Sequence, residues 1–311
     1  MALAPQEKAR LDAIAIATVG IEKLTAQEKR ALRKSQPSPR GPSVYKTEDR
    51  SIAGPVGEVP IRIYYPEGTG PFPALVWFHG GGWVVGDINT SDGTARHLCV
   101  GSQSIVVSVD YRLSPESKFP DAVEDCYAAT QWTVQNAAQL DVNPLLVSVG
   151  GDSAGGNLAA VMCLMAREKG GPDVAFQVLV YPVTDYNFTT GSYIQNGVGY
   201  GLTKDDMVWY WNQYLRNEDD AKNPYAAPAQ ANDLTGLPPA LVITAEYDPL
   251  CDEGAVYADR LRQSGVPTLY KRYDGVAHGF FGGWSIVDKG MDAVQHVCST
   301  LKRVASGESV E

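Results

Sequence analysis

Six short, nearly continuous apolar runs, with helical segments between most of them, constrain the fold of this chain more than any other feature. The runs cover residues 61–65, 74–78, 104–109, 145–149, 176–180 and 240–245. Helical apolar spacing covers residues 122–139, 156–169, 252–264 and 288–302. Short runs without polar alternation are typical of strands that are covered on both faces. The pattern therefore predicts an α/β fold, with a mostly parallel sheet and helices on both sides.

Two segments do not follow this alternation. Residues 1–45 contain helical spacing from residue 5 to residue 19 and a capping box at Thr25-Ala-Gln-Glu28, before a stretch with Pro and Ser at 35–43. Residues 184–228 are rich in Tyr, Trp, Gly and Asn and are too long for an ordinary connection. We predict a helical N-terminal arm (1–45) and an insertion (184–228) that together form a cap. The catalytic core would then comprise residues 46–183 and 229–311.

The charge and the cysteines exclude several classes of protein. Twenty-six basic and 36 acidic residues give a net charge of -10, which disfavours nucleic acid and anionic lipid as partners. No segment has 18 uninterrupted apolar residues, so no membrane span is expected. The N-terminal apolar run lacks a preceding basic region and contains Asp12, so we expect a cytoplasmic protein without a signal peptide. Five scattered cysteines without a C-x-x-C pair indicate neither a zinc site nor a redox couple.

Gly151-Asp-Ser153-Ala-Gly155 matches the pattern G-x-S-x-G. The pattern is weak alone, because a glycine-rich turn with a helix-capping serine has the same appearance. Its position between a predicted strand and a predicted helix is what favours a nucleophilic Ser153 on a sharp turn. The helix that follows would direct its N-terminus, which favours negative charge, at the reaction centre.

His79-Gly-Gly-Gly82 directly follows the predicted strand at 74–78. Consecutive glycines allow the backbone to approach another group closely. We predict that the N–H groups of Gly81 and Gly82, with that of Ala154, form an oxyanion hole, and that Gly80 shapes the turn. A phosphate-binding loop is the alternative, but no G-K-[ST] follows. For His79 we expect a structural role in anchoring the loop.

The chain order of this chemistry, serine then acid then histidine, leaves His278 and His296 as candidates for the general base. His296 falls within a predicted helix, whereas His278 lies in a loop after the strand-like residues 268–273, so we predict His278.

The third member of such a site is a carboxylate at a strand end. Asp248 lies just after the end of the apolar run at 240–245. Glu246 is the nearest alternative for the carboxylate, and Asp252 is a weaker one. A turn-forming aspartate is the other interpretation. As the third member, Asp248 would hold the imidazole in one tautomer.

Together the motifs resemble those of the hormone-sensitive-lipase family of esterases, also called bacterial lipolytic family IV. The resemblance covers residues 45–300 and rests on four ordered motifs: His79-Gly-Gly-Gly82, Gly151-Asp-Ser-Ala-Gly155, Asp248-Pro-Leu and His278-Gly-Phe. The serine motif is similar to that of the G-D-S-A-G subgroup. The resemblance implies an α/β-hydrolase fold with an eight-stranded sheet and a helical cap. It also implies hydrolysis of short- to medium-chain acyl esters through an acyl-enzyme, without a metal or cofactor.

Four aromatic residues are candidates for the substrate pocket: Trp83, Tyr181, Trp209 and Trp211. For each of them a place in the core of the cap is an equal alternative. A non-hydrolytic binding protein and a peptidase or other acyl-transfer enzyme on the same scaffold are the rival functions. Residues 268–273 would form an edge strand through which a homodimer could assemble, with Lys271 and Arg272 as guards against pairing.

Overall fold

The computed structural model describes residues 2–17, 19–36 and 38–309. Within these ranges eight strands form one sheet in the order β1-β2-β4-β3-β5-β6-β7-β8. They are β1 Lys46–Gly54, β2 Gly57–Tyr65, β3 Phe72–Phe78, β4 Ile105–Val109, β5 Val142–Asp152, β6 Gln177–Val180, β7 Ala240–Tyr247 and β8 Thr268–Ala277. The β1–β2 and β2–β4 pairs are antiparallel, and every other pair is parallel. The predicted α/β fold with a mostly parallel, eight-stranded sheet is confirmed.

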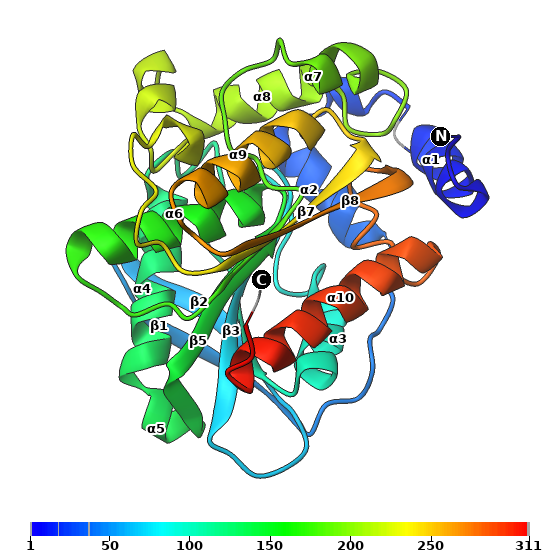
Figure 1. Ribbon diagram of the computed structural model, residues 1–311. Helices are drawn as coiled ribbons and strands as arrows, with labels where there is room; N and C mark the ends of the chain where they lie inside the picture. The colour runs from blue at the N-terminus through cyan, green and yellow to red at the C-terminus, as the bar shows by residue number, and fades with distance from the viewer. Residues whose placement is uncertain (1, 18, 37, 310–311) are drawn as a thin grey trace.

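Helices cover both faces of the sheet (Figure 1). They are α1 Pro5–Ala17, α2 Ala26–Ser35, α3 Asp92–Ser102, α4 Asp121–Gln135, α5 Ala137–Leu140, α6 Ala154–Lys169, α7 Gly191–Asn196, α8 Lys204–Tyr214, α9 Cys251–Gln263 and α10 Asp288–Ala305. Short 3₁₀ turns lie at Ile21–Lys23, Glu218–Lys222 and Pro228–Gln230. Helices α3 and α10 share a core with one face of the sheet, and α4, α6 and α9 share a core with the other.

The central strands explain why their sequences lack polar alternation. All five side chains of β4 are buried, as are the last five of β3. A fully buried aliphatic or aromatic side chain contributes about 1.5–3 kcal/mol, so both faces of these strands add to stability. Because β3 to β8 run parallel, their carboxyl ends lie along the same edge of the sheet.

Three local features differ from the sequence expectations or refine them. The predicted helix at 122–139 is divided into α4 and α5 at Asn136, whose side-chain amide donates to the carbonyl of Trp132 at 2.9 Å. Strand β1 and helix α3 were not predicted. The capping box at Thr25 is confirmed, because the Thr25 N–H donates to Glu28 Oε2 at 2.8 Å and the Glu28 N–H donates to Thr25 Oγ1 at 3.3 Å.

The N-terminal helices and the 184–228 segment are tied to the core beside the carboxyl ends of the strands. In Figure 1, α7 and α8 lie together along the upper side of the molecule. Arg30 of α2 donates to the carbonyls of Val84 and Ser114 at 2.6 and 2.5 Å. The Lys118 ammonium donates to three carbonyls at the C-terminal end of α8, where a cation also interacts favourably with the helix dipole. Polar contacts of the core thus hold both segments.

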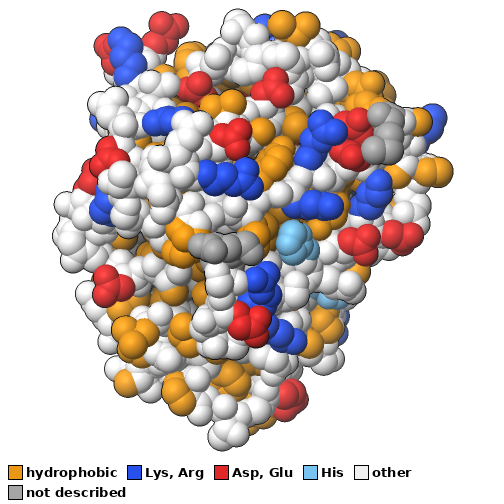
Figure 2. Space-filling view, in the orientation of Figure 1, with side chains coloured by type: hydrophobic (Ala, Val, Ile, Leu, Met, Phe, Trp, Pro, Cys, Tyr) orange, Lys and Arg blue, Asp and Glu red, His pale blue; other side chains and the backbone are white. Residues whose placement is uncertain are grey.

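Strand β8 lies at one end of the strand order, as predicted for residues 268–273, and Lys271 and Arg272 are exposed on it. Figure 2 shows one face of the molecule, on which basic and acidic side chains are interspersed.

Glu253 of α9 has a buried carboxyl group that binds the start of the 184–228 segment. Its Oε1 accepts the N–H of Thr184 at 2.7 Å and that of Asp185 at 3.5 Å. Its Oε2 has no hydrogen-bond partner among the described residues, and the residue is only 5% exposed. Burial therefore raises the pKa of Glu253 well above its ordinary value of 4.5.

We expect Glu253→Gln to stabilise the protein more at high pH than at low pH. A raised folded-state pKa contributes stability that is present below pH 4.5 and is lost as the pH rises toward the folded-state pKa. Glutamine cannot ionise in the unfolded chain, so the variant does not lose that stability. The difference in free energy of unfolding between variant and wild type should grow as the pH rises from 5 toward the folded-state pKa, by up to about 1.4 kcal/mol per unit. Urea denaturation at several pH values measures it, and a difference that does not change with pH would contradict the assignment.

Candidate active site

Four segments that follow parallel strands meet at the carboxyl edge of the sheet. The glycine loop beginning at His79 follows β3, Ser153 follows β5, Asp248 follows β7 and His278 follows β8. This edge is where open α/β sheets place their ligand sites. The topology brings together residues that are up to 199 positions apart (His79 to His278).

Ser153 occupies a strained turn between β5 and α6. Its backbone has φ 57° and ψ −120°, a region that residues with a side chain rarely adopt. A Cβ at Gly151 would lie 2.3 Å from the Gly155 backbone, and one at Gly155 would lie 1.9 Å from the carbonyl oxygen of Phe78. The flanking glycines of the motif are therefore required for the turn to pack against β3.

The Ser153 hydroxyl, the His278 ring and the Asp248 carboxylate form a continuous hydrogen-bonded chain. His278 Nδ1 lies 2.7 Å from Asp248 Oδ2, and His278 Nε2 lies 2.9 Å from Ser153 Oγ. A carboxylate can only accept, so Nδ1 carries the proton and Nε2 is left to accept from the serine. Asp248 is completely buried, and its other oxygen accepts the N–H of Leu250 at 2.8 Å. The imidazole is thereby held in one tautomer and one orientation.

The competing residues for these positions have other partners. Glu246 Oε2 accepts the N–H of Gly275 at 2.6 Å, and Asp252 Oδ2 accepts the N–H of Ser192 at 2.8 Å. His296 lies in α10, where its Nδ1 is 3.3 Å from the hydroxyl of Tyr273. These contacts direct the alternative side chains away from the Ser153–His278–Asp248 chain.

The glycine loop after β3 presents free N–H groups beside Ser153. Gly81 and Gly82 have φ of 123° and 59°. The carbonyl of Gly81 accepts from Val84 and Val85 at 3.1 and 2.9 Å. No acceptor among the described residues takes the N–H of Gly81 or Gly82. The cavity wall includes both glycines and Ser153, so the two glycines border the same space as the serine.

Gly80 and His79 hold this loop in place. The Gly80 N–H donates to Asp152 Oδ1 at 3.0 Å, which links the loop to the residue before the serine. Burial raises the pKa of the Asp152 carboxyl above its ordinary value. The His79 ring stacks on Tyr111 with centroids 4.4 Å apart, and the Tyr111 hydroxyl donates to the His79 carbonyl at 2.7 Å. These contacts fit the structural role that the sequence suggested for His79 and the turn-shaping role of Gly80.

A cavity of about 390 Å³ opens onto Ser153 and His278. Its apolar and aromatic wall consists of Val85, Tyr181, Val183, Leu202, Met207, Tyr210, Phe281, Trp284 and Ile286. Of the four aromatic residues predicted for a pocket, Tyr181 lines the cavity, and its ring centroid lies 4.5 Å from that of His278.

The other three aromatic residues do not line the cavity, so the prediction of pocket roles for Trp83, Trp209 and Trp211 is corrected. Trp83 is fully buried and stacks on Tyr214 with centroids 4.1 Å apart, and Trp211 packs on Trp83 at 4.8 Å. Trp209 lies under the ammonium of Lys29 at 4.4 Å.

The period of α8 gives the physical reason for this correction. Met207 and Tyr210 are three residues apart, share one helix face and line the cavity. Trp211 is directed into the core and Trp209 toward α2. The sequence predicted an aromatic-rich helix, but it did not indicate which face of that helix would line the cavity.

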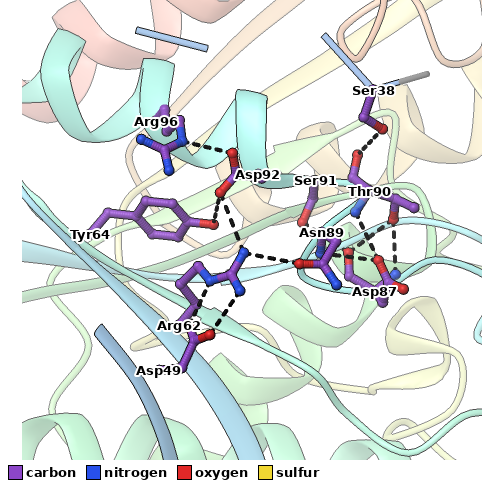
Figure 3. Close-up of polar contacts among 10 residues, drawn as sticks. All are labelled: Ser38, Asp49, Arg62, Tyr64, Asp87, Asn89, Thr90, Ser91, Asp92 and Arg96. Atoms are coloured by element: carbon purple, nitrogen blue, oxygen red, sulfur yellow. Dashed lines mark hydrogen bonds and ion pairs between the residues drawn. The ribbon is translucent and has the colours of Figure 1, made fainter. Parts of the chain in front are cut away.

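A polar network fixes the loop that forms another part of the cavity wall (Figure 3). Asp87 Oδ1 accepts the N–H groups of Asn89 and Thr90 at 3.0 and 2.8 Å. Arg62 donates to Asn89 Oδ1 at 3.0 Å and pairs with Asp92 at 3.5 Å. Thr90 and Ser91 of this loop line the cavity, together with Gly93 and Thr94 at the start of α3. The rim of the cavity is thereby held to strand β2.

Across residues 2–17, 19–36 and 38–309, no group of three or more His, Cys, Asp or Glu side chains is arranged to hold a metal ion. In the same ranges, no helix combines the length and the apolar character needed to cross a membrane.

Comparison with known proteins gives consistent matches. A family model described as the alpha/beta hydrolase fold matches residues 75–282. The chain is 46% identical to the carboxylic ester hydrolase LipN of Mycobacterium tuberculosis over 77% of this chain and 66% of that protein. It is 39% identical to the esterase LipI of the same organism over 83% and 82% of the two chains. The solved esterase of Pyrobaculum calidifontis shares 39% identity with a TM-score of 0.90, covering 98% of this chain and 99% of that one. The ester-hydrolase EH1AB1 from the Lake Arreo metagenome shares 38% identity with a TM-score of 0.93 over the same fractions.

We expect Gly155→Ala to lower the free energy of unfolding by about 2–3 kcal/mol, because its methyl group would meet backbone atoms of β3 that cannot move aside. Gly282→Ala is the matched control, since the nearest atom to a Cβ there is 3.7 Å away, and it should change stability by less than about 0.5 kcal/mol. Chemical denaturation measures both. Equal stability of the two variants would show that the turn tolerates a side chain at residue 155.

Proposed function

Because this chain belongs to the α/β-hydrolase-fold family and is a carboxylic ester hydrolase of the hormone-sensitive-lipase type, we propose that Ser153 is its nucleophile, His278 its general base and Asp248 the acid that orients the base. The observation that carries the proposal is the hydrogen-bonded chain, with Ser153 Oγ 2.9 Å from His278 Nε2. The hydroxyl stands beside N–H groups without acceptors, which is the arrangement that acyl transfer needs.

The reaction proceeds in two halves. Ser153 Oγ attacks the ester carbonyl carbon while its proton moves to His278 Nε2. The carbon–oxygen bond to the alcohol then breaks, and the alcohol leaves with the proton from His278. Water, deprotonated by His278, attacks the acyl-enzyme and releases the acid, and the proton returns to Ser153. Asp248 stays ionised and stabilises the imidazolium that forms in each half.

The negative oxygen of each tetrahedral intermediate is held by the N–H groups of Gly81, Gly82 and Ala154. Gly81 and Gly82 donate to no other group among the described residues, and Ala154 is the first residue of α6, where the helix dipole also favours an anion. Each such donor contributes about 3–4 kcal/mol to the transition state. The half-buried Asp152 contributes indirectly by holding Gly80.

The substrates of this proposal are esters of small or medium acyl groups. The apolar wall around Leu202, Met207 and Tyr210 favours an aliphatic or aromatic group, and a cavity of about 390 Å³ limits its length. Leu202, Met207 and Tyr210 belong to the 184–228 segment, and Arg33 of the 1–45 segment also lines the cavity. We therefore propose that residues 1–45 and 184–228 act together as a cap over the substrate.

A homodimer through β8 is a further part of the proposal. Its support is the position of β8 at the end of the strand order, where no further strand among the described residues pairs with it. Two chains related by a two-fold axis would extend the sheet across that edge.

We expect the wild-type protein to hydrolyse p-nitrophenyl butyrate and Ser153→Ala to lose at least about 10⁴-fold in kcat, because no other group can form the acyl-enzyme. A p-nitrophenyl phosphonate should add one phosphonyl group to the wild type, detected by mass spectrometry, and none to the variant. Ser299→Ala, which removes an exposed hydroxyl from α10, is the control and should retain full activity. A wild type that binds esters without turnover and resists the phosphonate would indicate a binding protein instead.

Replacing Tyr210 with alanine should shift the preference toward longer acyl chains. The Tyr210 ring lines the cavity next to Gly82, so its removal enlarges the space beside the proposed oxyanion donors. We expect the ratio of kcat/KM for octanoate and butyrate esters to rise about 10-fold, the scale of one or two methylenes in an apolar pocket. Trp209→Ala changes the adjacent residue on another face of α8 and should leave the ratio within about 2-fold. A larger effect of Trp209→Ala would place the substrate elsewhere.

A further inference from the structure

Helix α1 contacts the segment that carries His278, although the two are at opposite ends of the sequence. Figure 1 shows α1 beside the end of β8. The N–H of Ala4 donates to the carbonyl of Gly275 at 2.8 Å, and the side chain of Gln6 accepts the N–H of Asp288 at 3.0 Å. The start of α1 therefore adds hydrogen bonds along both sides of the His278 loop.

Glu7 makes the contact immediately before His278. Its side chain is completely buried, and its Oε1 accepts the N–H of Ala277 at 2.9 Å. A buried carboxylate needs a cation and hydrogen-bond donors to offset its desolvation. Arg10, one turn later in α1, supplies them through Nε at 2.8 Å and a terminal nitrogen at 2.6 Å.

Arg10 makes the contact immediately after the Cα of His278. The same terminal nitrogen that binds Glu7 also donates to the carbonyl of His278 at 2.9 Å. Gly279 and Gly283 leave the space for its side chain, since a Cβ at Gly283 would lie 3.1 Å from Arg10 Cδ. The pair thus binds the 276–277 and 278–279 peptide groups, which lie at the two ends of the stretch Ala277–His278 that carries the imidazole.

The His278 segment needs such external support. It lies between Gly275 and Gly279, whose φ values of 74° and 81° belong to conformations that favour glycine. Glycines on both sides give a loop more backbone freedom than other residues would. The ring of His278 must nevertheless keep both of its bonds, to Asp248 and to Ser153, within about 3 Å.

We propose that Glu7 and Arg10 form a clamp that positions the general base, and that α1 is therefore a working part of the active site. The proposal rests on the function proposed above for Ser153 and His278. A purely stabilising role does not explain the pair, because replacing a buried ion pair with apolar side chains is often neutral or stabilising. The same helix also carries an exposed pair, Lys8 and Asp12, at 2.7 Å, which contacts nothing in the active site.

The test compares these two ion pairs. In Glu7→Leu/Arg10→Met apolar side chains of similar size replace the clamp, and in Lys8→Met/Asp12→Leu they replace the exposed pair. We expect the first variant to lose about 10- to 100-fold in kcat for p-nitrophenyl butyrate with KM within 2-fold of the wild type, because the base is misplaced while the substrate cavity is intact. Its phosphonate labelling should slow by the same factor. The second variant should match the wild type.

Two further measurements separate positioning from general loss of structure. The low-field proton resonance of the His278 Nδ1–H bonded to Asp248 should be present in the wild type and broadened or lost in the clamp variant. The amide of Ala277 should exchange with deuterium faster in that variant, because it loses its acceptor. Arg10→Lys keeps the charge without the two-pronged geometry and should recover part of kcat relative to Arg10→Met.

A clamp variant with wild-type kcat and an unchanged His278 proton resonance would overturn the proposal. If instead the wild type neither hydrolyses esters nor reacts with the phosphonate, the proposed function is wrong. The proton resonance and the Ala277 exchange rate would still decide whether Glu7 and Arg10 hold the imidazole. Should the clamp variant not fold, Arg10→Lys alone tests the proposal by the same readouts.

Discussion

The backbone of Ser153, held at φ 57° between β5 and α6, is the constraint on which the rest of the site depends. A residue with a side chain remains there only where the surrounding structure fixes it. Here the fixing contacts are the close approach of Gly155 to Phe78 of β3 and the hydrogen bond from the Ser153 N–H to Val180 of β6 at 2.9 Å. The two strands that flank β5 therefore hold the turn, and the buried parallel sheet has a direct chemical consequence.

The polar groups around this turn are each held by further hydrogen bonds. Asp248 is buried with a backbone donor on its second oxygen, and Gly80 is held by Asp152. His278 is bonded through its ring to Asp248 and through its backbone to Arg10. A site built in this way loses little free energy to reorganisation during a reaction, because its donors and acceptors are already directed. The glycines in the loops of Gly80 and His278 give those loops backbone freedom, which these contacts restrict.

The sequence predicted those parts of the molecule that a local pattern can encode. Continuous apolar runs identified the buried strands, and three motifs placed Ser153, Asp248 and His278 on three loops, which the fold brings within hydrogen-bonding distance. Strand β1 was not predicted, because most of its side chains are exposed or half-buried and its sequence therefore resembles that of a polar loop. Helix α3 was not predicted, because Gly93 and Gly101 weaken the helical pattern of its sequence at both ends. The cavity-facing side of α8 and the burial of Glu7 depend on distant partners, and no local pattern reports such contacts.

The bond between Glu7 and Ala277 joins residues that are 270 positions apart. During synthesis the ribosome releases the first helix long before the strand that it will hold has been made. The helix has little apolar surface to bury by itself, with only Glu7 and Leu11 buried in its described length, so it gains a fixed place late. Strands β1 to β7 all precede β8 in the chain, so they are synthesised before the strand that this helix contacts. The place of this helix therefore depends on β8, the last strand of the sheet in chain order.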